Sequence, residues 1–118
     1  MDKSILVVDD HTGIRMLMSE VFRSAGFDVR CTGDDVEARS IAEQYRPRIG
    51  IFDINLNGCN GLDLLEDIKR KNPGMVPIVV SASEYPDTQH IPHESEVYYM
   101  KKPFDIGELK AKICELCG

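Results

Sequence analysis

The sequence predicts an α/β domain with a doubly wound, mostly parallel sheet. Short apolar segments alternate along the chain with longer segments of helical periodicity, as they do where parallel strands are joined by crossover helices. Most of the short segments are continuous apolar runs, which favour strands buried on both faces, whereas the strict alternation from Phe27 to Cys31 favours an edge strand. The length of 118 residues suits one hydrophobic core, so we expect a single domain with helices on both faces of the sheet.

Five strands are expected, in chain order, at Ile5–Val8, Phe27–Cys31, Ile49–Phe52, Val76–Val80 and Val97–Met100. Helices are expected where apolar residues recur every three or four positions, over residues 14–25, 38–45, 61–68 and 106–116. Gly26 is expected to end the first of these helices, Pro47 follows the second, and Pro73-Gly74 follows the third. Each apolar stripe is interpreted as the face that packs on the sheet.

The segment between Ser83 and Glu96 is expected to contain only a short or irregular fourth helix. Pro86 can begin a helix, because its missing N–H would have no partner in the first turn, but Pro92 cannot lie inside one. Any helix is therefore limited to about five residues, too short to be stable alone. We predict a segment more mobile than the rest of the domain, so partner contacts are expected through the first or last helix.

The composition indicates a globular protein and argues against several classes. Hydrophobic residues make up 42% and charged residues 29% of the chain, and the net charge is −6 with a pI near 5.0. This acidic balance argues against direct nucleic-acid binding. No apolar run is long enough to span a membrane, and no signal segment opens the chain, so a cytoplasmic location without membrane insertion is expected.

Neither the cysteines nor the histidines form a recognisable metal or redox motif. Cys114 and Cys117 make a C-x-x-C at the end of the last predicted helix, where we expect reduced thiols rather than redox or zinc chemistry. His11, His90 and His93 show no ligand spacing with other metal-type residues, and we expect them to be exposed.

Polar side chains follow the apolar runs in a pattern that predicts a site. Asp9 and Asp10 follow the first run, Asp53 the third, Ser81 the fourth and Lys102 the fifth. Ligands of doubly wound sheets bind beyond the carboxyl ends of the strands. If the first strand lies centrally beside the third, all five side chains converge on one edge of the sheet.

Such a cluster has a definite chemistry. Two carboxylates about 4 Å apart repel each other by roughly 4 kcal/mol at an effective dielectric near 20, and a bound cation relieves that repulsion. A few carboxylate oxygens completed by water suit Mg²⁺. Lys102 adds a positive charge and Ser81 a hydroxyl donor, so the group indicates a phosphoryl-transfer site in which a carboxylate forms an aspartyl phosphate.

Each of these residues also has a purely structural interpretation. Asp9-Asp10 could cap a helix, Lys102 could be a surface lysine, and Ser81 could simply end its strand. These alternatives are common when each residue is taken alone. The register of Asp53 and Lys102 with the acidic pair favours the functional interpretation.

Four matches appear in a family-specific order: the Asp9-Asp10 pair, Phe52-Asp53, Ser81-Ala82 and the run from Tyr99 to Phe104. In this order and spacing, which covers nearly the whole chain, the sequence resembles the receiver domains of two-component response regulators. The resemblance implies a flavodoxin-like fold with strand order 2-1-3-4-5. It also implies that residues 1–118 are one receiver domain, with no effector domain in this chain.

The resemblance implies a phosphoacceptor and a metal site. Asp53 would receive a phosphoryl group from a sensor histidine kinase, a phosphotransfer protein or a small phosphodonor. Asp10, Asp53 and the Asn55 backbone carbonyl would bind Mg²⁺, or Mn²⁺ in its place, with Asp9 acting through water.

The resemblance also implies a switch. Ser81 and Lys102 would contact the phosphoryl group, Lys102 being chosen because it directly precedes Pro103. Tyr99 would be the aromatic residue that moves, and since strand alternation sends Tyr98 to the opposite face, only one of the two can do so. The signal would pass by conformational change to a downstream protein or to an effector domain outside this chain, and no enzymatic turnover of another substrate is expected.

The chain departs from the family pattern in two places. The usual Met-Pro and Asp-Gly elements after the phosphoacceptor are here Leu56-Asn57 and Asn60-Gly61, so the geometry of that loop is expected to differ. The segment from Ser83 to Glu96 lacks the usual alanine-rich helix. These differences leave the site chemistry intact and affect the surface used for output.

Two other function classes remain open from the sequence. An aspartyl-phosphate phosphatase of the haloacid dehalogenase type also places an aspartate after a strand, but it needs a second acid where this chain has Asn55. A flavin or nucleotide binder, or a non-catalytic protein-interaction module, would use the same fold.

Overall fold

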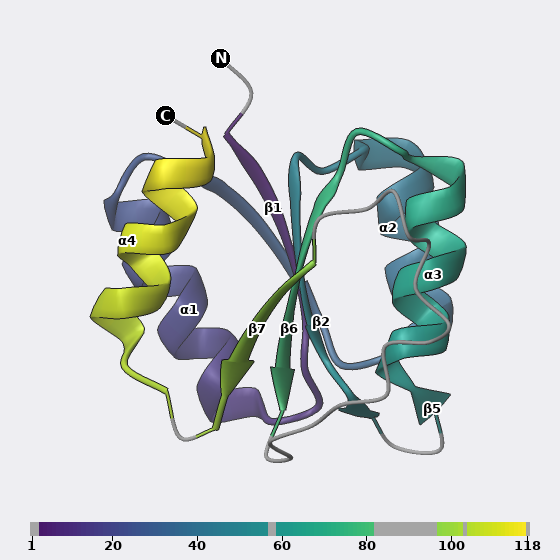
Figure 1. Cartoon of the computed structure of the whole chain (residues 1–118), viewed down its shortest axis with the longest axis horizontal. Helices are drawn as coiled ribbons and strands as arrows, with labels where there is room; N and C mark the ends of the chain where they lie inside the picture. Colours follow the sequence, from purple (N-terminus) through teal and green to yellow (C-terminus); the bar gives the residue numbers. More distant parts are fainter. Residues whose placement is uncertain (1–2, 57–58, 82–96, 103, 118) are drawn as a thin grey trace.

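Five parallel strands form the central sheet of the computed structural model, which describes residues 3–56, 59–81, 97–102 and 104–117 (Figure 1). The strands are β1 (Ser4–Val8), β2 (Asp28–Thr32), β3 (Ile49–Asp53), β6 (Val76–Ser81) and β7 (Tyr98–Lys101). Their spatial order is β2-β1-β3-β6-β7, and every neighbouring pair is parallel. Counted among these five strands alone, this is the predicted order 2-1-3-4-5, so the flavodoxin-like topology is confirmed.

Among the residues that the structure describes, two helices pack on each face of the sheet, as can be followed in Figure 1. One face carries α1 (Thr12–Ser24) and α4 (Ile106–Cys117), and the other carries α2 (Asp35–Tyr45) and α3 (Gly61–Lys71). Successive residues of β1 serve the two cores in turn, because Ile5 and Val7 contact the first layer of helices while Leu6 and Val8 contact the second. This two-sided burial is the reason for the continuous apolar run.

The helix and strand limits follow the expected signals closely. Helix α1 ends at Ser24, and Gly26 just beyond it has φ of 93°, a left-handed conformation that glycine adopts without strain. The strand predicted over Phe27–Cys31 is observed one position later, and it is an edge strand that pairs only with β1 among the described strands.

A small antiparallel pair that the sequence did not predict follows β3. It joins β4 (Asn55–Leu56) to β5 (Cys59–Asn60) and leads directly into α3. The Asn60 side chain caps that helix, since its Oδ1 accepts from the Leu62 N–H at 2.8 Å. The predicted short fourth helix between Ser83 and Glu96 lies outside the described residues and stays a prediction.

Two further expectations concern membranes and thiols. None of the helices that the structure describes has the length and apolar character needed to cross a membrane. None of the four cysteines forms a disulfide, and in the C-x-x-C of α4 Cys114 is exposed whereas Cys117 belongs to the core.

Candidate functional site

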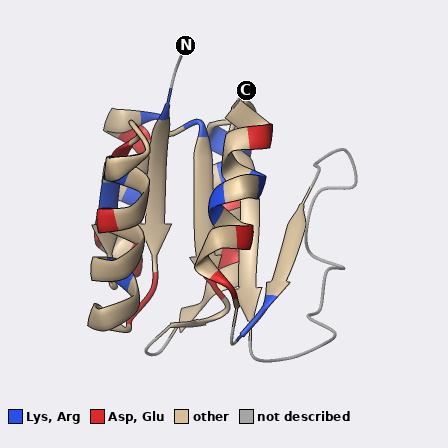
Figure 2. Ribbon diagram, turned by 90° about the vertical axis from the view of Figure 1, so that its left-hand side faces the viewer, with Lys and Arg blue, Asp and Glu red and all other residues tan. Residues whose placement is uncertain are grey.

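Three strand ends bring charged side chains together at the carboxyl edge of the sheet. Asp9 follows β1, Asp53 is the last residue of β3, and Lys102 follows β7. Figure 2 shows an acidic stretch just beyond the arrowhead of β1 and a basic stretch at the end of the edge strand β7. Asp9 and Asp53 are only 2% and 3% exposed, so both carboxylates are buried at this edge of the sheet.

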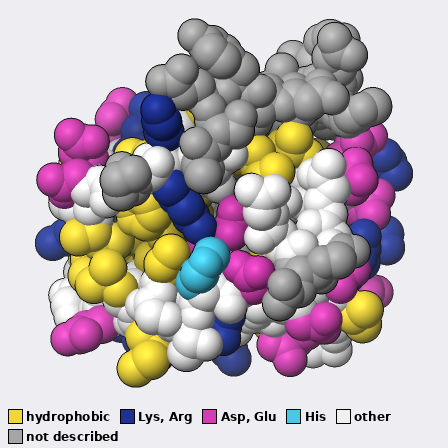
Figure 3. All heavy atoms as spheres, turned by 90° about the horizontal axis from the view of Figure 1, so that it is seen from below, with side chains coloured by type: hydrophobic (Ala, Val, Ile, Leu, Met, Phe, Trp, Pro, Cys, Tyr) yellow, Lys and Arg dark blue, Asp and Glu magenta, His cyan; other side chains and the backbone are white. Residues whose placement is uncertain are grey.

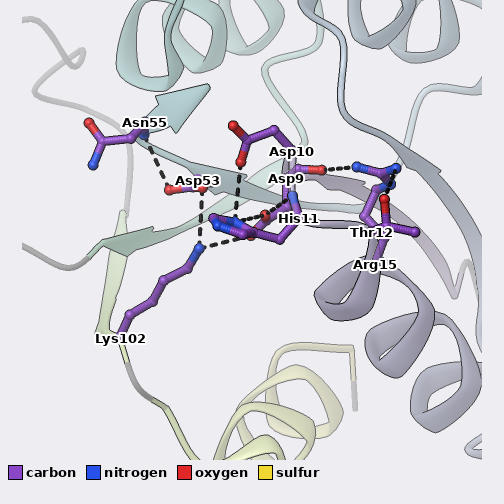
Figure 4. Close-up of polar contacts among 8 residues, drawn as sticks. All are labelled: Asp9, Asp10, His11, Thr12, Arg15, Asp53, Asn55 and Lys102. Carbon is purple, nitrogen blue, oxygen red and sulfur yellow. Dashed lines mark hydrogen bonds and ion pairs between the residues drawn. The ribbon is translucent and has the colours of Figure 1, made fainter. Parts of the chain in front are cut away.

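Lys102 is the cation that holds the two buried carboxylates. Its Nζ lies 3.1 Å from Asp9 Oδ2 and 3.2 Å from Asp53 Oδ2 (Figure 4). Burial acts to lower the pKa of Lys102, but the hydrogen bonds and charges of Asp9 and Asp53 outweigh it, so the pKa is raised. Lys102 therefore remains positively charged, whereas its neighbour Lys101 points to the exposed side of β7.

Opposing influences act on the pKa of Asp53. Burial is the largest effect on its pKa and raises it, while the Asn55 N–H, which donates to Asp53 Oδ1 at 3.2 Å, lowers it. The charge of Asp9 raises the pKa again and Lys102 lowers it, with a net shift upwards. The folded protein therefore disfavours the ionised form of Asp53, and an additional positive charge nearby would relieve that cost.

The turn between β1 and α1 brings Asp10 and His11 to the same place. The His11 N–H donates to Asp9 Oδ1 at 2.9 Å, and His11 Nδ1 lies 3.1 Å from Asp9 Oδ1 and 3.2 Å from Asp10 Oδ1 (Figure 4). Asp10 Oδ1 is buried and has no hydrogen-bond partner among the described residues. It is the least compensated acceptor of the cluster.

Two interpretations of this turn are corrected by the structure. The acidic pair does not cap α1, because the N-cap residue is His11, which makes no side-chain cap bond. His11 is exposed as expected, but the view that it lacks ligand spacing with metal-type residues is wrong. The turn is so tight that Asp9, Asp10 and His11 all present ligand atoms to one point. The sequence feature that indicated this grouping was the direct succession of the three residues after a buried strand.

These residues fit a divalent cation. One ligand atom from each of Asp9, Asp10, His11 and Asp53 lies within 4.8 Å of the others. Counted over Asp9, Asp10, Asp53 and Lys102 alone, three carboxylates and one ammonium leave an excess of two negative charges. Together with the Asp10 oxygen that has no hydrogen-bond partner among the described residues, this predominantly carboxylate donor set is one that could hold a metal ion such as Mg²⁺.

The other predicted residues lie around the same edge. Ser81 is the last residue of β6, is 3% exposed, and accepts from the Lys102 N–H through its carbonyl at 2.7 Å. Asn55 reaches the site through its N–H, and the role expected for its carbonyl stays a prediction. Tyr99 is 42% exposed on β7, whereas Tyr98 packs on the α1 and α4 side of the sheet.

Some residues that support the site were missed from the sequence. Arg15 Nη1 donates to the Asp9 carbonyl at 2.6 Å and its Nη2 to Thr12 Oγ1 at 3.3 Å, which ties α1 to the end of β1. Gly61 begins α3 so close to β3 that a Cβ there would lie 1.9 Å from the Asp53 carbonyl oxygen. The Asn60-Gly61 pair before a helical stripe was a usable signal for this contact, whereas nothing in the sequence separates Arg15 from a surface arginine.

Comparisons with a family model and with known relatives indicate the same protein family. The response regulator receiver domain model matches residues 5–114. Sporulation initiation phosphotransferase F of Bacillus subtilis is 30% identical over 93% of this chain and 90% of its own length. The DNA-binding transcriptional regulator NtrC of Bradyrhizobium sp. is 37% identical over 90% of this chain, which spans only 22% of that relative.

The fold comparison agrees with the sequence comparison. A CheY-like response regulator receiver domain from Methanospirillum hungatei superposes with a TM-score of 0.82 at 25% identity, covering 98% of this chain and 97% of that one. The family match covers both halves of the sheet and every strand end that contributes to the acidic site. This chain belongs to the response regulator receiver domain family, the signalling domains of two-component systems.

Proposed function

We propose that this chain is a phosphorylation-switched receiver in which Asp53 accepts a phosphoryl group. The donor is the phosphohistidine of a sensor histidine kinase or of a phosphotransfer protein, or a small molecule such as acetyl phosphate. The observation that carries the proposal is the buried Asp53 carboxylate, which shares the ammonium of Lys102 with Asp9, beside an Asp10 Oδ1 that has no hydrogen-bond partner among the described residues. Membership of the receiver family supports it independently.

The transfer is a displacement at phosphorus. A carboxylate oxygen of Asp53 attacks, a P–O bond forms on Asp53, and the bond to the donor nitrogen or oxygen breaks, with the electron pair leaving on the donor. Lys102 Nζ, 3.2 Å from Asp53 Oδ2, is within reach of a phosphoryl oxygen carried on Asp53. Asp10 and Asp53 would hold Mg²⁺ or Mn²⁺, with the Asn55 carbonyl and with Asp9 through water, and the ion supplies positive charge against the phosphoryl oxygens.

A conformational switch would follow from the new phosphoryl group. Charge-assisted hydrogen bonds from Ser81 and Lys102 contribute about 1.5–3 kcal/mol each. Two of them approach the ~5.5 kcal/mol that turns a 1:99 equilibrium into 99:1. Movement of Ser81 towards the phosphoryl group would leave room for Tyr99, half-exposed on the edge strand, to turn inwards.

Output would then pass through protein contacts. The acidic net charge of −6 argues against nucleic-acid binding by this domain itself. NtrC, a DNA-binding regulator by its name, is much longer than this chain, so an effector domain or a separate protein is the proposed recipient. The chain would catalyse only its own phosphorylation and dephosphorylation, because Asn55 occupies the position where a phosphatase of the alternative class needs an acid.

The test is intact-mass analysis after incubation with acetyl phosphate, with Mg²⁺ and with excess EDTA. We expect one phosphoryl group per chain with Mg²⁺, removed by base or hydroxylamine, and little with EDTA. Asp53→Asn should abolish the adduct. Asp63→Asn, which removes an exposed carboxylate in the first turn of α3, is the matched control and should leave labelling unchanged.

Labelling of Asp53→Asn at full stoichiometry would refute the assignment of the acceptor. Equal labelling in EDTA would show that the acidic cluster serves another purpose. Steady release of phosphate from a phosphate ester, without a stable adduct, would favour the phosphatase class instead.

A further inference from the structure

His11 occupies a position from which it faces the acidic site on two sides. It is the N-cap of α1 with an extended backbone, φ −85° and ψ 112°, and its N–H is anchored to Asp9 Oδ1 at 2.9 Å. That anchor turns the imidazole towards the carboxylates, where Nδ1 comes within 3.1 Å of Asp9 Oδ1 and 3.2 Å of Asp10 Oδ1 (Figure 4). The ring is thus oriented by its own backbone before any ion arrives.

The imidazole is also open to solvent. The His11 side chain is 64% exposed, whereas Asp9 is almost wholly buried beneath it. Figure 3 looks onto this end of the molecule and shows the one histidine among the described residues between basic and acidic side chains. An ion that enters the acidic site from solvent would therefore meet the imidazole as well as the carboxylates.

The contact with Asp10 is the informative one. Asp10 Oδ1 lies 3.2 Å from His11 Nδ1, yet it has no hydrogen-bond partner among the described residues. A divalent cation at this point would take the place of any proton on Nδ1, so the imidazole nitrogen and the Asp10 carboxylate can both act as ligands of one ion. The same point is within reach of Asp9 and Asp53, whose ligand atoms lie within 4.8 Å of those of Asp10 and His11.

We propose that His11 is a metal ligand through Nδ1 and that it determines the selectivity of this site. The inference rests on the proposed metal site of the receiver and adds a nitrogen donor to a set otherwise made of oxygens. Mg²⁺ prefers oxygen ligands and gains little from an imidazole. Mn²⁺, Co²⁺, Ni²⁺ and Zn²⁺ accept imidazole readily, so His11 shifts the preference of the site from Mg²⁺ towards these ions.

The competing explanation is that His11 only orients Asp9 and Asp10. A residue that merely positions the carboxylates would affect every divalent ion to a similar extent. A ligand would affect nitrogen-accepting ions far more than Mg²⁺. The ratio of two dissociation constants therefore separates the explanations, because it does not depend on how well the carboxylates are held.

The experiment measures Kd for Mg²⁺ and for Ni²⁺ by titration calorimetry on the wild-type chain and on His11→Ala and His11→Gln. We expect Ni²⁺ to bind at least ~10-fold more weakly in both variants, comparable to the 10–100-fold losses seen when metal sites lose a supporting group. Mg²⁺ binding should change less than about 3-fold, well under that range. A chain carrying His90→Gln and His93→Gln is the matched control and should behave as wild type.

A spectroscopic readout identifies the ligand directly. Electron spin-echo envelope modulation of the Mn²⁺-loaded wild-type chain should show coupling to an imidazole nitrogen. The coupling should vanish in His11→Gln and persist in the double histidine control. Circular dichroism and thermal melts check that each variant is folded.

Each alternative outcome has a distinct meaning. Equal losses for Mg²⁺ and Ni²⁺, or an unchanged Kd for both, would overturn the role of His11 while leaving the proposed receiver chemistry intact. Absence of nitrogen coupling in the folded wild-type chain would also overturn it. Failure of the wild-type chain to bind either ion would reject the metal site itself, and with it both proposals.

Discussion

Asp53 is an ionisable side chain that the fold holds where water barely reaches it. Its pKa is raised chiefly by burial, and Asp9 beside it acts in the same direction. The Asn55 N–H and Lys102 offset part of this cost without removing it. The ionised Asp53 carboxylate therefore lowers the stability of the folded protein. A bound cation, or a substitution that removes the charge, should reduce this cost.

Asp53→Asn is expected to stabilise the metal-free protein at neutral pH. A folded pKa above the ordinary carboxyl value means that the ionised form destabilises the native state at any pH above that raised pKa. The gain should be on the order of 1 kcal/mol, within the ~0.5–3 kcal/mol typical of point substitutions. It should shrink as the pH falls through the raised pKa, because wild-type Asp53 then becomes neutral too. Urea denaturation in EDTA across pH measures both.

Lys102→Met is the companion variant with the opposite expected sign. It leaves Asp9 and Asp53 without the ammonium that lies 3.1 Å and 3.2 Å from them, so the metal-free domain should lose stability. If both variants shifted the unfolding midpoint in the same direction in EDTA, the charge balance described for this site would be incorrect.

The junction between β3 and α3 is the element that places Asp53 on a rigid base. The Gly61 N–H donates to the Ile54 carbonyl at 2.7 Å, and Asn60 caps the helix. No side chain fits at position 61, since a Cβ would lie 1.9 Å from the Asp53 carbonyl oxygen and 2.9 Å from Ile54 Cα. The atoms in the way are backbone, so they move only if β3 and the helix start move with them.

Gly61→Ala should therefore impair stability and phosphorylation together. We expect a loss of about 1–3 kcal/mol, as for other overpacked sites, and slower labelling by acetyl phosphate because the Asp53 backbone is displaced. Gly13→Ala in the first turn of α1 is the control, because a Cβ there meets nothing within 4 Å. It should gain up to about 1 kcal/mol from the better helix propensity of alanine.

Unfolding midpoints and initial labelling rates of the two glycine variants provide the check. A Gly61→Ala protein as stable and as quickly labelled as wild type would mean that this junction is more compliant than the contact implies.

At the scale of the whole molecule, the site exists only because the sheet is wound in both directions from β1. Lys102 and Asp9 are separated by 93 positions in sequence, yet their side chains are in contact. Asp9, Asp53 and Lys102 lie at the carboxyl ends of β1, β3 and β7, which meet at one edge of the sheet. They do so although β6 lies between β3 and β7. A ligand that bridges these strand ends should consequently stabilise the entire fold.

Mg²⁺ should raise the stability of the folded domain by mass action. At a free concentration of about 100 times Kd the gain is ~2.7 kcal/mol, provided that the unfolded chain does not bind the ion. Asp10→Asn should lose most of this gain because it removes the least compensated ligand, whereas Asp63→Asn should retain it. Thermal unfolding over a Mg²⁺ series measures the effect, and a midpoint independent of Mg²⁺ in the wild-type chain would contradict it.

The sequence by itself determined the sheet, its order of elements and the family. Hydrophobic periodicity is a local property that burial imposes on each strand and helix, so Ile5–Val8 and the stripe of α1 were visible without coordinates. Asp9, Asp53, Ser81 and Lys102 were predicted as a group for a related reason. Residues that end parallel strands must share one edge whatever the details of packing.

Only the tertiary structure decided the contacts that depend on the conformation of a turn or on the distance between two elements. The approach of Gly61 to the Asp53 carbonyl, the bond from Arg15 to the Asp9 carbonyl and the turn of His11 towards Asp9 and Asp10 leave no periodic trace in the sequence. Periodicity records which face of an element is buried, but not the direction of a side chain in a turn or the separation of two backbones. Those are set by the packing of α1 and α3 against the sheet, and they decide how the acidic site would hold its ion.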